Sequence, residues 1–287
     1  MRTFVAIALV GLVSVVRSDL PHYNLEKSFD TGLRECAELN EISNCDLKQY
    51  IADSFPNVPI VRKLLRCSML NVKSYNDATG VWQPQMSAFF QPSPADSCYQ
   101  NRTQVCLNSI PERVDPSDVD SLAYESFQCY YRSYGDLVES DQFLRDSPLE
   151  FGQVLVATSD YLQLSGETLV DLCKGNILNN DQFPKILYVI AVRAGFYSVN
   201  SGVQLNRLYI QFGNEALLTP ETQQCVDDVA QENCSADDVT QNYQIFVKCL
   251  EPLLPIPKLL QEFSKQRVSD PDVCDCSSPQ VQVYNVA

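Results

Sequence analysis

Cysteine is the residue type that most constrains how this chain can fold. The 287 residues contain 12 cysteines, an even number, and no two of them stand in a Cys-x-x-Cys arrangement. Zinc-binding and thioredoxin-like sites lack their usual spacing, so the cysteines predict disulfide bonds. Six precede residue 130 and six follow residue 170, which favours two cross-linked units of ordinary domain size. The first set is Cys36, Cys45, Cys67, Cys98, Cys106 and Cys129, and the second is Cys173, Cys225, Cys234, Cys249, Cys274 and Cys276.

The N-terminus predicts export from the cell. An apolar run over residues 4–16 follows Met1-Arg2 and leads to a cleavage signal at Val16-Arg17-Ser18. This order is typical of a secretory signal peptide, which is too short to be a transmembrane helix. We therefore expect residues 1–18 to be removed and the mature protein to be secreted into the extracellular space. No later stretch is apolar for long enough to predict a membrane span.

Charge and histidine content argue against several classes of function. The formal net charge of −15 disfavours nucleic acid and anionic membrane surfaces as partners. The one histidine, His22, cannot supply a catalytic triad or a multi-histidine metal site, and the 10 glycines form no phosphate-binding motif. The acidic pairs Asp227-Asp228 and Asp237-Asp238 are interpreted as solvated residues near helix starts. We expect no enzyme, no metal and no cofactor.

The two halves repeat the same order of signals. Residues 75–81 read Tyr-Asn-Asp-Ala-Thr-Gly-Val and residues 197–203 read Tyr-Ser-Val-Asn-Ser-Gly-Val. Ser93-Pro94 and Thr219-Pro220 each predict a helix start with proline in the first turn. This agreement indicates an internal duplication.

Helical periodicity dominates the chain. Apolar residues recur at helical spacing over residues 59–72 and 149–164, and also around Cys129 and Cys249. Period-2 alternation is scarce, which predicts an all-α protein. Residues 133–148 are polar and predict a linker, or in part an extension of the last helix of the first domain. Residues 269–287 predict a tail held by a disulfide. The expected division is a signal peptide at 1–18, a first domain at 19–140 and a second domain with its tail at 145–287.

The cysteine contexts resemble a known family. Cys36 lies in Leu-Arg-Glu-Cys-Ala-Glu-Leu, Cys67 lies in Lys-Leu-Leu-Arg-Cys-Ser-Met-Leu, and the turn at Gly80 follows. These features resemble the insect odorant-binding protein family, which has an all-helical fold. Two such units in one chain resemble the double-domain, atypical members from mosquitoes and the long salivary ligand-scavenging proteins of blood-feeding flies.

The resemblance implies part of the disulfide pairing. It implies Cys36–Cys67, Cys106–Cys129 and, by elimination, Cys45–Cys98 in the first domain. In the second domain it implies Cys234–Cys249. The remaining four cysteines allow three pairings. Cys173–Cys225 parallels the first domain but leaves the tight pair Cys274–Cys276, so a tail cysteine joined to Cys173 or Cys225 is the alternative.

The chain departs from the family at one of its usual bridges. Lys63 and Asp120 stand where the family's second and fifth cysteines fall in the first half. In the second half, Ile186 and Thr240 take these places, and Ala157 and Ile190 replace the first and third cysteines. Either the bridge was lost at both ends together, or Lys63 and Asp120 are unrelated exposed residues.

The resemblance implies a carrier of small hydrophobic molecules such as odorants or pheromones, with a chemosensory receptor as a further partner. Aromatic and apolar side chains on the expected inner helix faces are the candidate ligand contacts, and core packing explains each of them as well. They are Leu65, Met69, Trp82, Phe89, Phe90 and Phe127 in the first domain, and Tyr188, Phe196, Tyr209, Phe212 and Phe246 in the second.

Two alternative functions remain open at this point. One is a salivary scavenger of host biogenic amines or eicosanoids, and the other is an exported structural or interaction protein without a ligand. The acidic residues are shared almost evenly between the halves, which favours neutral, apolar ligands over amines. Asn101 and Asn233 begin the two N-glycosylation sequons. The sequence indicates neither the ligand nor the oligomeric state.

Overall fold

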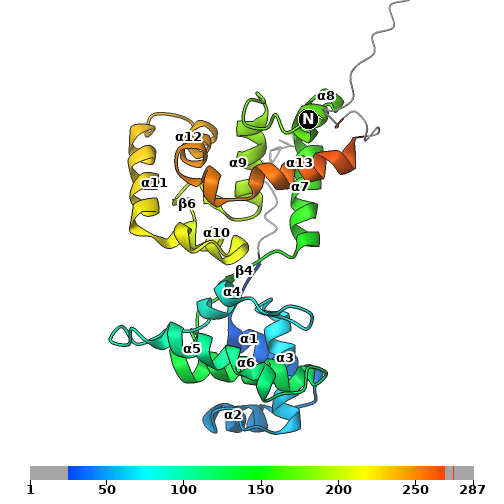
Figure 1. Cartoon of the computed structure of the whole chain (residues 1–287), viewed down its shortest axis with the longest axis vertical. Helices are drawn as coiled ribbons and strands as arrows, with labels where there is room; N and C mark the ends of the chain where they lie inside the picture. The colour runs from blue at the N-terminus through cyan, green and yellow to red at the C-terminus, as the bar shows by residue number, and fades with distance from the viewer. Residues whose placement is uncertain (1–24, 269–273, 275–287) are drawn as a thin grey trace, which may run out of the picture.

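The computed structural model describes residues 25–268 and residue 274 (Figure 1). The predicted signal peptide, His22, Cys276 and most of the predicted tail lie outside these residues. The described part is all-α, with three small two-stranded sheets. Its helices form two tandem domains, each around its own buried hydrophobic cluster.

The first domain is built on three helices that pack together, α1, α3 and α6. Ser28 caps α1 through its side chain, and Pro59 stands in the first turn of α3. Phe29, Leu64 and Phe127, one from each helix, are fully buried. The elements of this domain are β1 (Leu25–Lys27), α1 (Phe29–Leu39), α2 (Asn44–Ala52), α3 (Pro59–Asn71), β2 (Tyr75–Asn76), β3 (Gly80–Val81), α4 (Gln83–Ala88), α5 (Tyr99–Asn108), η1 (Ile110–Glu112) and α6 (Val119–Tyr134).

The second domain repeats this order and adds a final helix. Ser147 and Glu150 form a capping box at the start of α7. Thr219 caps α11 and Pro220 is the first residue of that helix, which confirms the helix start predicted there. The added helix, α13, packs against α8. The elements are β4 (Gln142–Leu144), α7 (Pro148–Leu162), α8 (Gly166–Cys173), α9 (Phe183–Arg193), β5 (Tyr197–Ser198), β6 (Gly202–Val203), α10 (Leu205–Phe212), η2 (Glu215–Leu218), α11 (Pro220–Glu232), α12 (Asp238–Ile245), η3 (Phe246–Leu250), η4 (Glu251–Leu253) and α13 (Ile256–Arg267).

The sequence repeat folds into two matching hairpins. Tyr75 pairs with Val81 between β2 and β3, and Tyr197 pairs with Val203 between β5 and β6. Gly80 and Gly202 have φ of 77° and 68°. These positive angles explain why glycine stands at the same place in both halves.

Two predictions about local structure are wrong. Ser93-Pro94 begins no helix, because the next helix, α5, starts only at Tyr99 after Cys98. The segment 133–148, which was expected to be a linker, also contains regular structure. Its residues 142–144 form β4, which pairs antiparallel with β1 and so contributes to the junction of the two domains.

The disulfides confirm two of the implied pairs. Cys36 is bonded to Cys67, which joins α1 to α3, and Cys106 is bonded to Cys129, which joins α5 to α6. The pair Cys45–Cys98 is wrong, because both residues are unpaired and exposed. Cys45 is in the first turn of α2 and Cys98 precedes α5.

In the second domain the implied pair Cys234–Cys249 is wrong, and the alternative of a tail cysteine bonded to Cys173 is confirmed. Cys249 is bonded to Cys225 rather than to Cys234, which is unpaired and exposed. Cys234 lies at the turn between α11 and α12, whereas Cys249 lies beyond the far end of α12. Cys173 is bonded to Cys274, the alternative in which a tail cysteine reaches back to α8.

The family disulfide that would join positions 63 and 120 is absent, and an ion pair links the same two helices instead. Asp120 on α6 forms an ion pair with Arg66 on α3, at 3.2 Å, while Lys63 is exposed. In the second domain, Ile186 and Ile190 are fully buried on α9. Apolar packing therefore occupies the places of two family cysteines there.

Candidate ligand pocket

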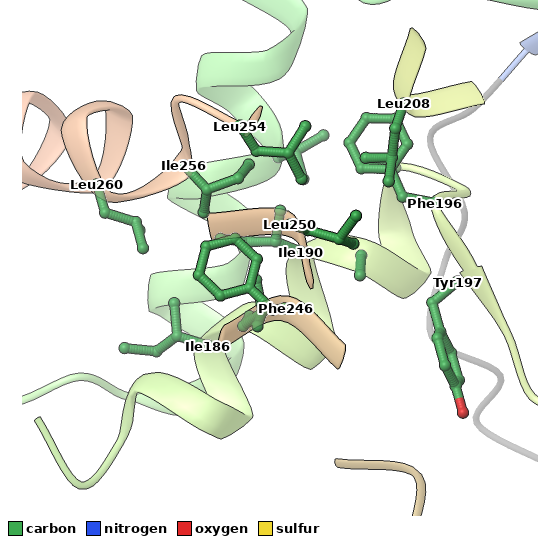
Figure 2. Close-up of a cluster of buried hydrophobic side chains, with 14 of the residues drawn as sticks. Ile186, Ile190, Phe196, Tyr197, Leu208, Phe246, Leu250, Leu254, Ile256 and Leu260 are labelled. Atoms are coloured by element: carbon green, nitrogen blue, oxygen red, sulfur yellow. The ribbon is translucent and has the colours of Figure 1, made fainter. Parts of the chain in front are cut away.

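An apolar pocket lies inside the second domain. Its walls come from α9, α10, α12, η3 and the segment before α13. Figure 2 shows Phe246, Leu254 and Ile256 gathered around Ile190, whereas Tyr197 points away from them. The lining residues are Leu187, Ile190, Ala191, Phe196, Val203, Leu208, Asn242, Phe246, Leu250, Leu254 and Ile256.

The pocket is nearly closed. Its volume is about 30 Å³, which is room for a water molecule but not for an organic ligand. Part of the wall comes from Leu254, in the short connection between η4 and α13, and from Ile256, the first residue of α13. A ligand can therefore enter only if this connection or a neighbouring side chain moves.

Asn242 is the one polar residue in the pocket wall. The residue is 5 % exposed, and its Nδ2 has no hydrogen-bond partner. A buried amide donor without a partner costs about 1–3 kcal/mol. Such a group in an apolar wall is available to donate a hydrogen bond to a ligand.

A π-helical segment shapes the same wall. The α-helix α12 continues directly into the π-helix η3. Phe246 and Leu250 from η3 both contact the pocket and lie four residues apart. Short π-helical insertions occur frequently at functional sites, because they change which side chains face one direction.

The structure separates the five candidate residues of the second domain. Phe196 and Phe246 line the pocket. Phe212 packs against Phe196 at a ring distance of 5.7 Å, just behind the wall. Tyr188 packs against Tyr197 at 5.6 Å, while Tyr209 faces a cleft between the domains.

The candidates of the first domain pack against one another in its core. The Phe127 ring lies 5.4 Å from Phe29, 5.0 Å from Phe55 and 6.0 Å from Phe90. Leu65, Met69 and Phe89 are likewise fully buried in the same cluster. These contacts are those of a filled hydrophobic core.

Trp82 lies between the two domains. Its Nε1 donates a hydrogen bond to the Ile210 carbonyl oxygen, at 2.7 Å, and the Arg145 guanidinium lies 4.1 Å from its ring centre. A Cβ added to Gly213 would come within 3.1 Å of the same ring. Trp82 therefore anchors the second domain on the first.

Sequence reasoning missed Asn242 and the segment at residues 254–256. Asn242 precedes Phe246 by one helical turn, so both lie on the same helix face. A polar residue on an otherwise apolar face was the sequence signal that could have identified Asn242. For Leu254 and Ile256 no local signal existed. Their position depends on α13 folding back against α8.

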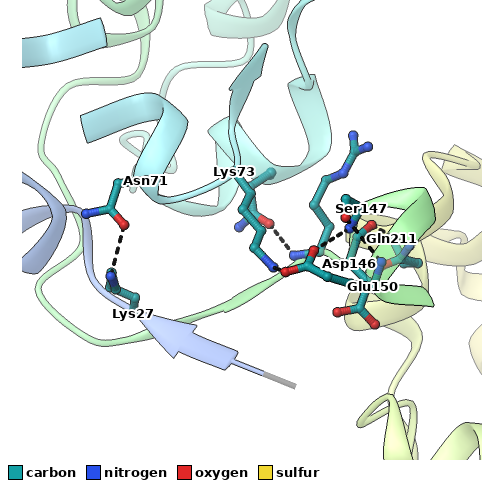
Figure 3. A network of polar contacts seen from close by, with 9 residues as sticks. Lys27, Asn71, Lys73, Asp146, Ser147, Glu150 and Gln211 are labelled. Atoms are coloured by element: carbon teal, nitrogen blue, oxygen red, sulfur yellow. Dashed lines mark hydrogen bonds and ion pairs between the residues drawn. The ribbon is translucent and has the colours of Figure 1, made fainter. Parts of the chain in front are cut away.

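A polar network surrounds Asp146 at the domain junction (Figure 3). The Asp146 N–H donates to Gln211 Oε1 at 2.7 Å, and Gln211 Nε2 donates to the Asp146 carbonyl at 3.0 Å. Nearby, Lys73 of the first domain forms an ion pair with Glu150 of the second at 2.8 Å. Burial raises the pKa of the Asp146 carboxyl to about 6, with a smaller contribution from Glu150, while Lys73 opposes the shift.

Within residues 25–268, together with Cys274, no three histidine, cysteine or acidic side chains are arranged to hold a metal ion. None of the helices in the described part of the chain is long and apolar enough to cross a membrane.

Comparison with known proteins agrees with the fold. Residues 22–133 match the PBP/GOBP family model. General odorant-binding protein 69 of Anopheles gambiae is 27 % identical over 128 residues, which is 41 % of this chain and 55 % of that protein. The chain thus spans about half the length of this relative. No solved structure matches the chain. The similarity to the PBP/GOBP family therefore covers the first domain of the chain.

Proposed function

We propose that this protein is an extracellular carrier that binds a small, predominantly apolar molecule in the pocket of its second domain. The similarity of the first domain to odorant-binding proteins supports the role of a small-ligand carrier. The assignment to the second domain rests on the pocket itself. The single observation that carries it is the unpartnered Nδ2 of Asn242 in an otherwise apolar wall.

The pocket chemistry favours a neutral ligand. None of the lining residues is charged. An ammonium group placed there would lose its hydration without gaining a carboxylate partner, which is costly. A carbonyl, ether or hydroxyl oxygen on an apolar skeleton would accept the Asn242 hydrogen bond and bury the remaining surface. This argues for odorant-like molecules and against amines as ligands of this pocket.

Binding requires the pocket to widen. The closed volume of about 30 Å³ must grow several-fold to enclose a typical ligand. The connection at residues 254–255 carries Leu254 in the wall and belongs to no helix, so it is the part of the wall that can move with the smallest loss of stability. α13 follows it and is tied back by the Cys173–Cys274 bond. The bond limits how far the wall can open.

The test is displacement of a neutral fluorescent probe, N-phenyl-1-naphthylamine, from purified protein. The substitution Ala191→Leu fills the pocket and should weaken probe binding at least about ten-fold. Ala123→Leu is the matched control, because Ala123 is fully buried in the other core. Thermal unfolding checks that both variants are folded.

The result that would overturn the proposal is equally clear. Probe binding that survives Ala191→Leu but is lost in Ala123→Leu would move the site to the first domain. Probe binding that is absent in the wild-type protein, with tight binding of an amine such as serotonin, would favour the scavenger alternative.

A further inference from the structure

A second, larger cavity lies between the two domains. Its volume is about 550 Å³, and it is bounded by α4, α5 and α6 of the first domain and by α10 and η2 of the second. We name it the interdomain cleft. It is lined by Gln83, Pro84, Ser87, Ala88, Pro92, Tyr99, Gln100, Asn101, Thr103, Gln104, Tyr130, Tyr134, Gln142, Asn206, Tyr209, Glu215 and Leu218.

The chemistry of this cleft differs from that of the apolar pocket. Four tyrosines from both domains meet there, Tyr99, Tyr130, Tyr134 and Tyr209, and the rings of Tyr99 and Tyr134 lie 4.6 Å apart. Six amide side chains and one carboxylate surround them, and no lysine or arginine contributes to the lining. Rings for stacking and amides for hydrogen bonds are the groups that bind the apolar faces and the hydroxyls of a sugar.

The hydroxyls of Tyr134 and Tyr209 in the cleft are neutral. Burial is the main cause that raises the pKa of Tyr134 to about 12, and the neighbouring hydroxyls of Tyr99 and Tyr209 add to it. Burial likewise raises the pKa of Tyr209, with smaller contributions from Glu215 and Tyr99. These phenols therefore act as hydrogen-bond donors and acceptors at neutral pH.

The chain carries its own sugar attachment signal inside this cleft. Asn101 lies on α5, is exposed and begins the sequon Asn101-Arg102-Thr103. Its side chain makes no hydrogen bond to the described residues, and it is one of the lining residues. The Thr103 side chain is buried, with its hydroxyl donating to the Tyr99 carbonyl oxygen at 2.9 Å. Glycans are added before folding is complete, so this later burial does not prevent recognition of the sequon.

The other sequon lacks these properties. The Asn233 Nδ2 donates to the Val229 carbonyl oxygen at 2.8 Å, at the C-terminal end of α11. A glycan on this nitrogen would take away one of its hydrogens and crowd the helix end. Asn233 is not among the residues of the cleft. The two sites therefore provide an internal comparison.

We infer that Asn101 carries an N-glycan whose first N-acetylglucosamine residues lie in the interdomain cleft, against tyrosines of both domains. The glycan then contacts Tyr134 and Tyr209 and adds to the contacts that hold the domains together. Its position covers the partly exposed tyrosines Tyr99, Tyr134 and Tyr209, which the proposed carrier function does not use. The inference requires export, and the experiment establishes export separately.

The experiment uses the full chain secreted from insect cells and collected from the medium. Inhibition of mannose trimming keeps the glycan in the high-mannose form, and peptide mass spectrometry measures occupancy at Asn101 and Asn233. Endoglycosidase H, which cuts between the first two N-acetylglucosamines, is then applied to native and denatured protein. We expect occupied Asn101 and cleavage about ten-fold slower in the native protein, because the bond is covered until the cleft opens.

Variants separate packing against the cleft from simple crowding. Tyr209→Ala removes a ring of the second domain and should bring native cleavage close to the denatured rate, whereas Tyr209→Phe should keep the protection. Asn206→Ala, at an exposed residue of the cleft, is the second variant if Tyr209→Ala does not fold, and it should accelerate native cleavage. Secreted protein with unoccupied Asn101, or equal cleavage rates in native wild type and in a folded variant that lacks the tyrosine ring, overturns the inference.

Discussion

Leu25 and Leu144 lie opposite each other in the antiparallel pair of β1 and β4. Each stands three residues before the serine that caps the first helix of its domain, Ser28 for α1 and Ser147 for α7. When a residue pairs with the residue at the equivalent position of the other domain, a local two-fold axis passes through that pair. The two domains therefore meet as two copies of one chain meet in a symmetric dimer.

Other contacts follow the same symmetry. The corresponding helices α4 and α10 pack against each other. Gln85 is the third residue of α4 and contacts β4 of the second domain. Arg207 is the third residue of α10 and contacts β1 of the first domain. Gln85 Nε2 donates to the Phe143 carbonyl oxygen at 2.8 Å, and Arg207 forms an ion pair with Glu26 at 2.6 Å. The duplication thus explains the junction as well as the repeated hairpins.

Substitution of Gln85 should loosen this junction more than substitution of Arg207. Gln85 is fully buried and bonds both Phe143 O and Arg145 N, so Gln85→Ala leaves two backbone groups without partners. We expect a loss of about 2–4 kcal/mol in the free energy of unfolding. Arg207→Ala removes a partly exposed ion pair and should cost about 1 kcal/mol or less. Guanidinium unfolding curves measure both, and equal losses would contradict the prediction.

Substitution of Asn242 should have opposite effects on stability and binding. Asn242→Leu removes the unpartnered buried amide, so the second domain should become about 1 kcal/mol more stable. Affinity for ligands with an oxygen acceptor should fall about five-fold. A pure hydrocarbon of similar size is the control ligand and should bind at least as well as to the wild type. An equal loss for both ligands would show that the amide makes no bond to the ligand.

Stability should depend on pH through Asp146. The folded-state pKa of about 6 lies above the ordinary value of 3.8. The folded protein therefore holds this proton more tightly, and stability is lost as the pH rises from about 4 through 6. At pH 7, Asp146→Asn should be more stable than the wild type by up to about 3 kcal/mol, and the difference should shrink towards pH 4.

The neighbours of Asp146 determine the control for this measurement. Lys73 and Glu150 face the carboxyl, and their ion pair is present in both proteins. Asp141→Asn, at an exposed position beside β4, is the matched control and should change stability by less than about 0.5 kcal/mol at either pH. A difference between wild type and Asp146→Asn that stays constant from pH 4 to 7 would contradict the raised pKa.

The helices could be predicted from sequence because their signals are local. The spacing of apolar residues, the cap at Thr219 and the proline in the first turn of α3 depend on only a few neighbours. The hairpins at Gly80 and Gly202 could be predicted as matching turns for the same reason. In contrast, the role of Trp82 depends on Ile210 and Gly213, which are far away in the sequence. No local pattern reports such a partner.

The pairing of Cys249 could have been found from sequence with one further argument. In a pair of antiparallel helices, bonded residues lie at similar distances from the turn between them. Cys106 and Cys129 are separated by 23 residues, and Cys225 and Cys249 by 24. Cys234 lies too close to the turn to reach Cys249. The family order of cysteines, used without this geometry, led to the wrong pair.

The bond between Cys173 and Cys274 should control ligand exchange. It closes a loop with a sequence separation of 101, and its loss should cost up to about 5 kcal/mol in the chain-entropy model. The double variant Cys173→Ser/Cys274→Ser frees the end of α13, so the pocket wall at Leu254 should open more often. We expect faster dissociation of the probe in stopped-flow measurements. An unchanged rate in a folded double variant would show that α13 does not limit entry.

Chemical labelling should distinguish the bonded from the unbonded cysteines. Alkylation of the unreduced protein should modify Cys45, Cys98 and Cys234, because these three are exposed and unpaired. Cys234→Ser should leave the free energy of unfolding within about 0.5 kcal/mol of the wild type. Cys249→Ser should cost about 3 kcal/mol and make Cys225 newly reactive, since their bond closes a loop with a sequence separation of 24. A peptide that contains Cys234 joined to Cys249 would show instead that the family order holds and that α11 pairs in a different register.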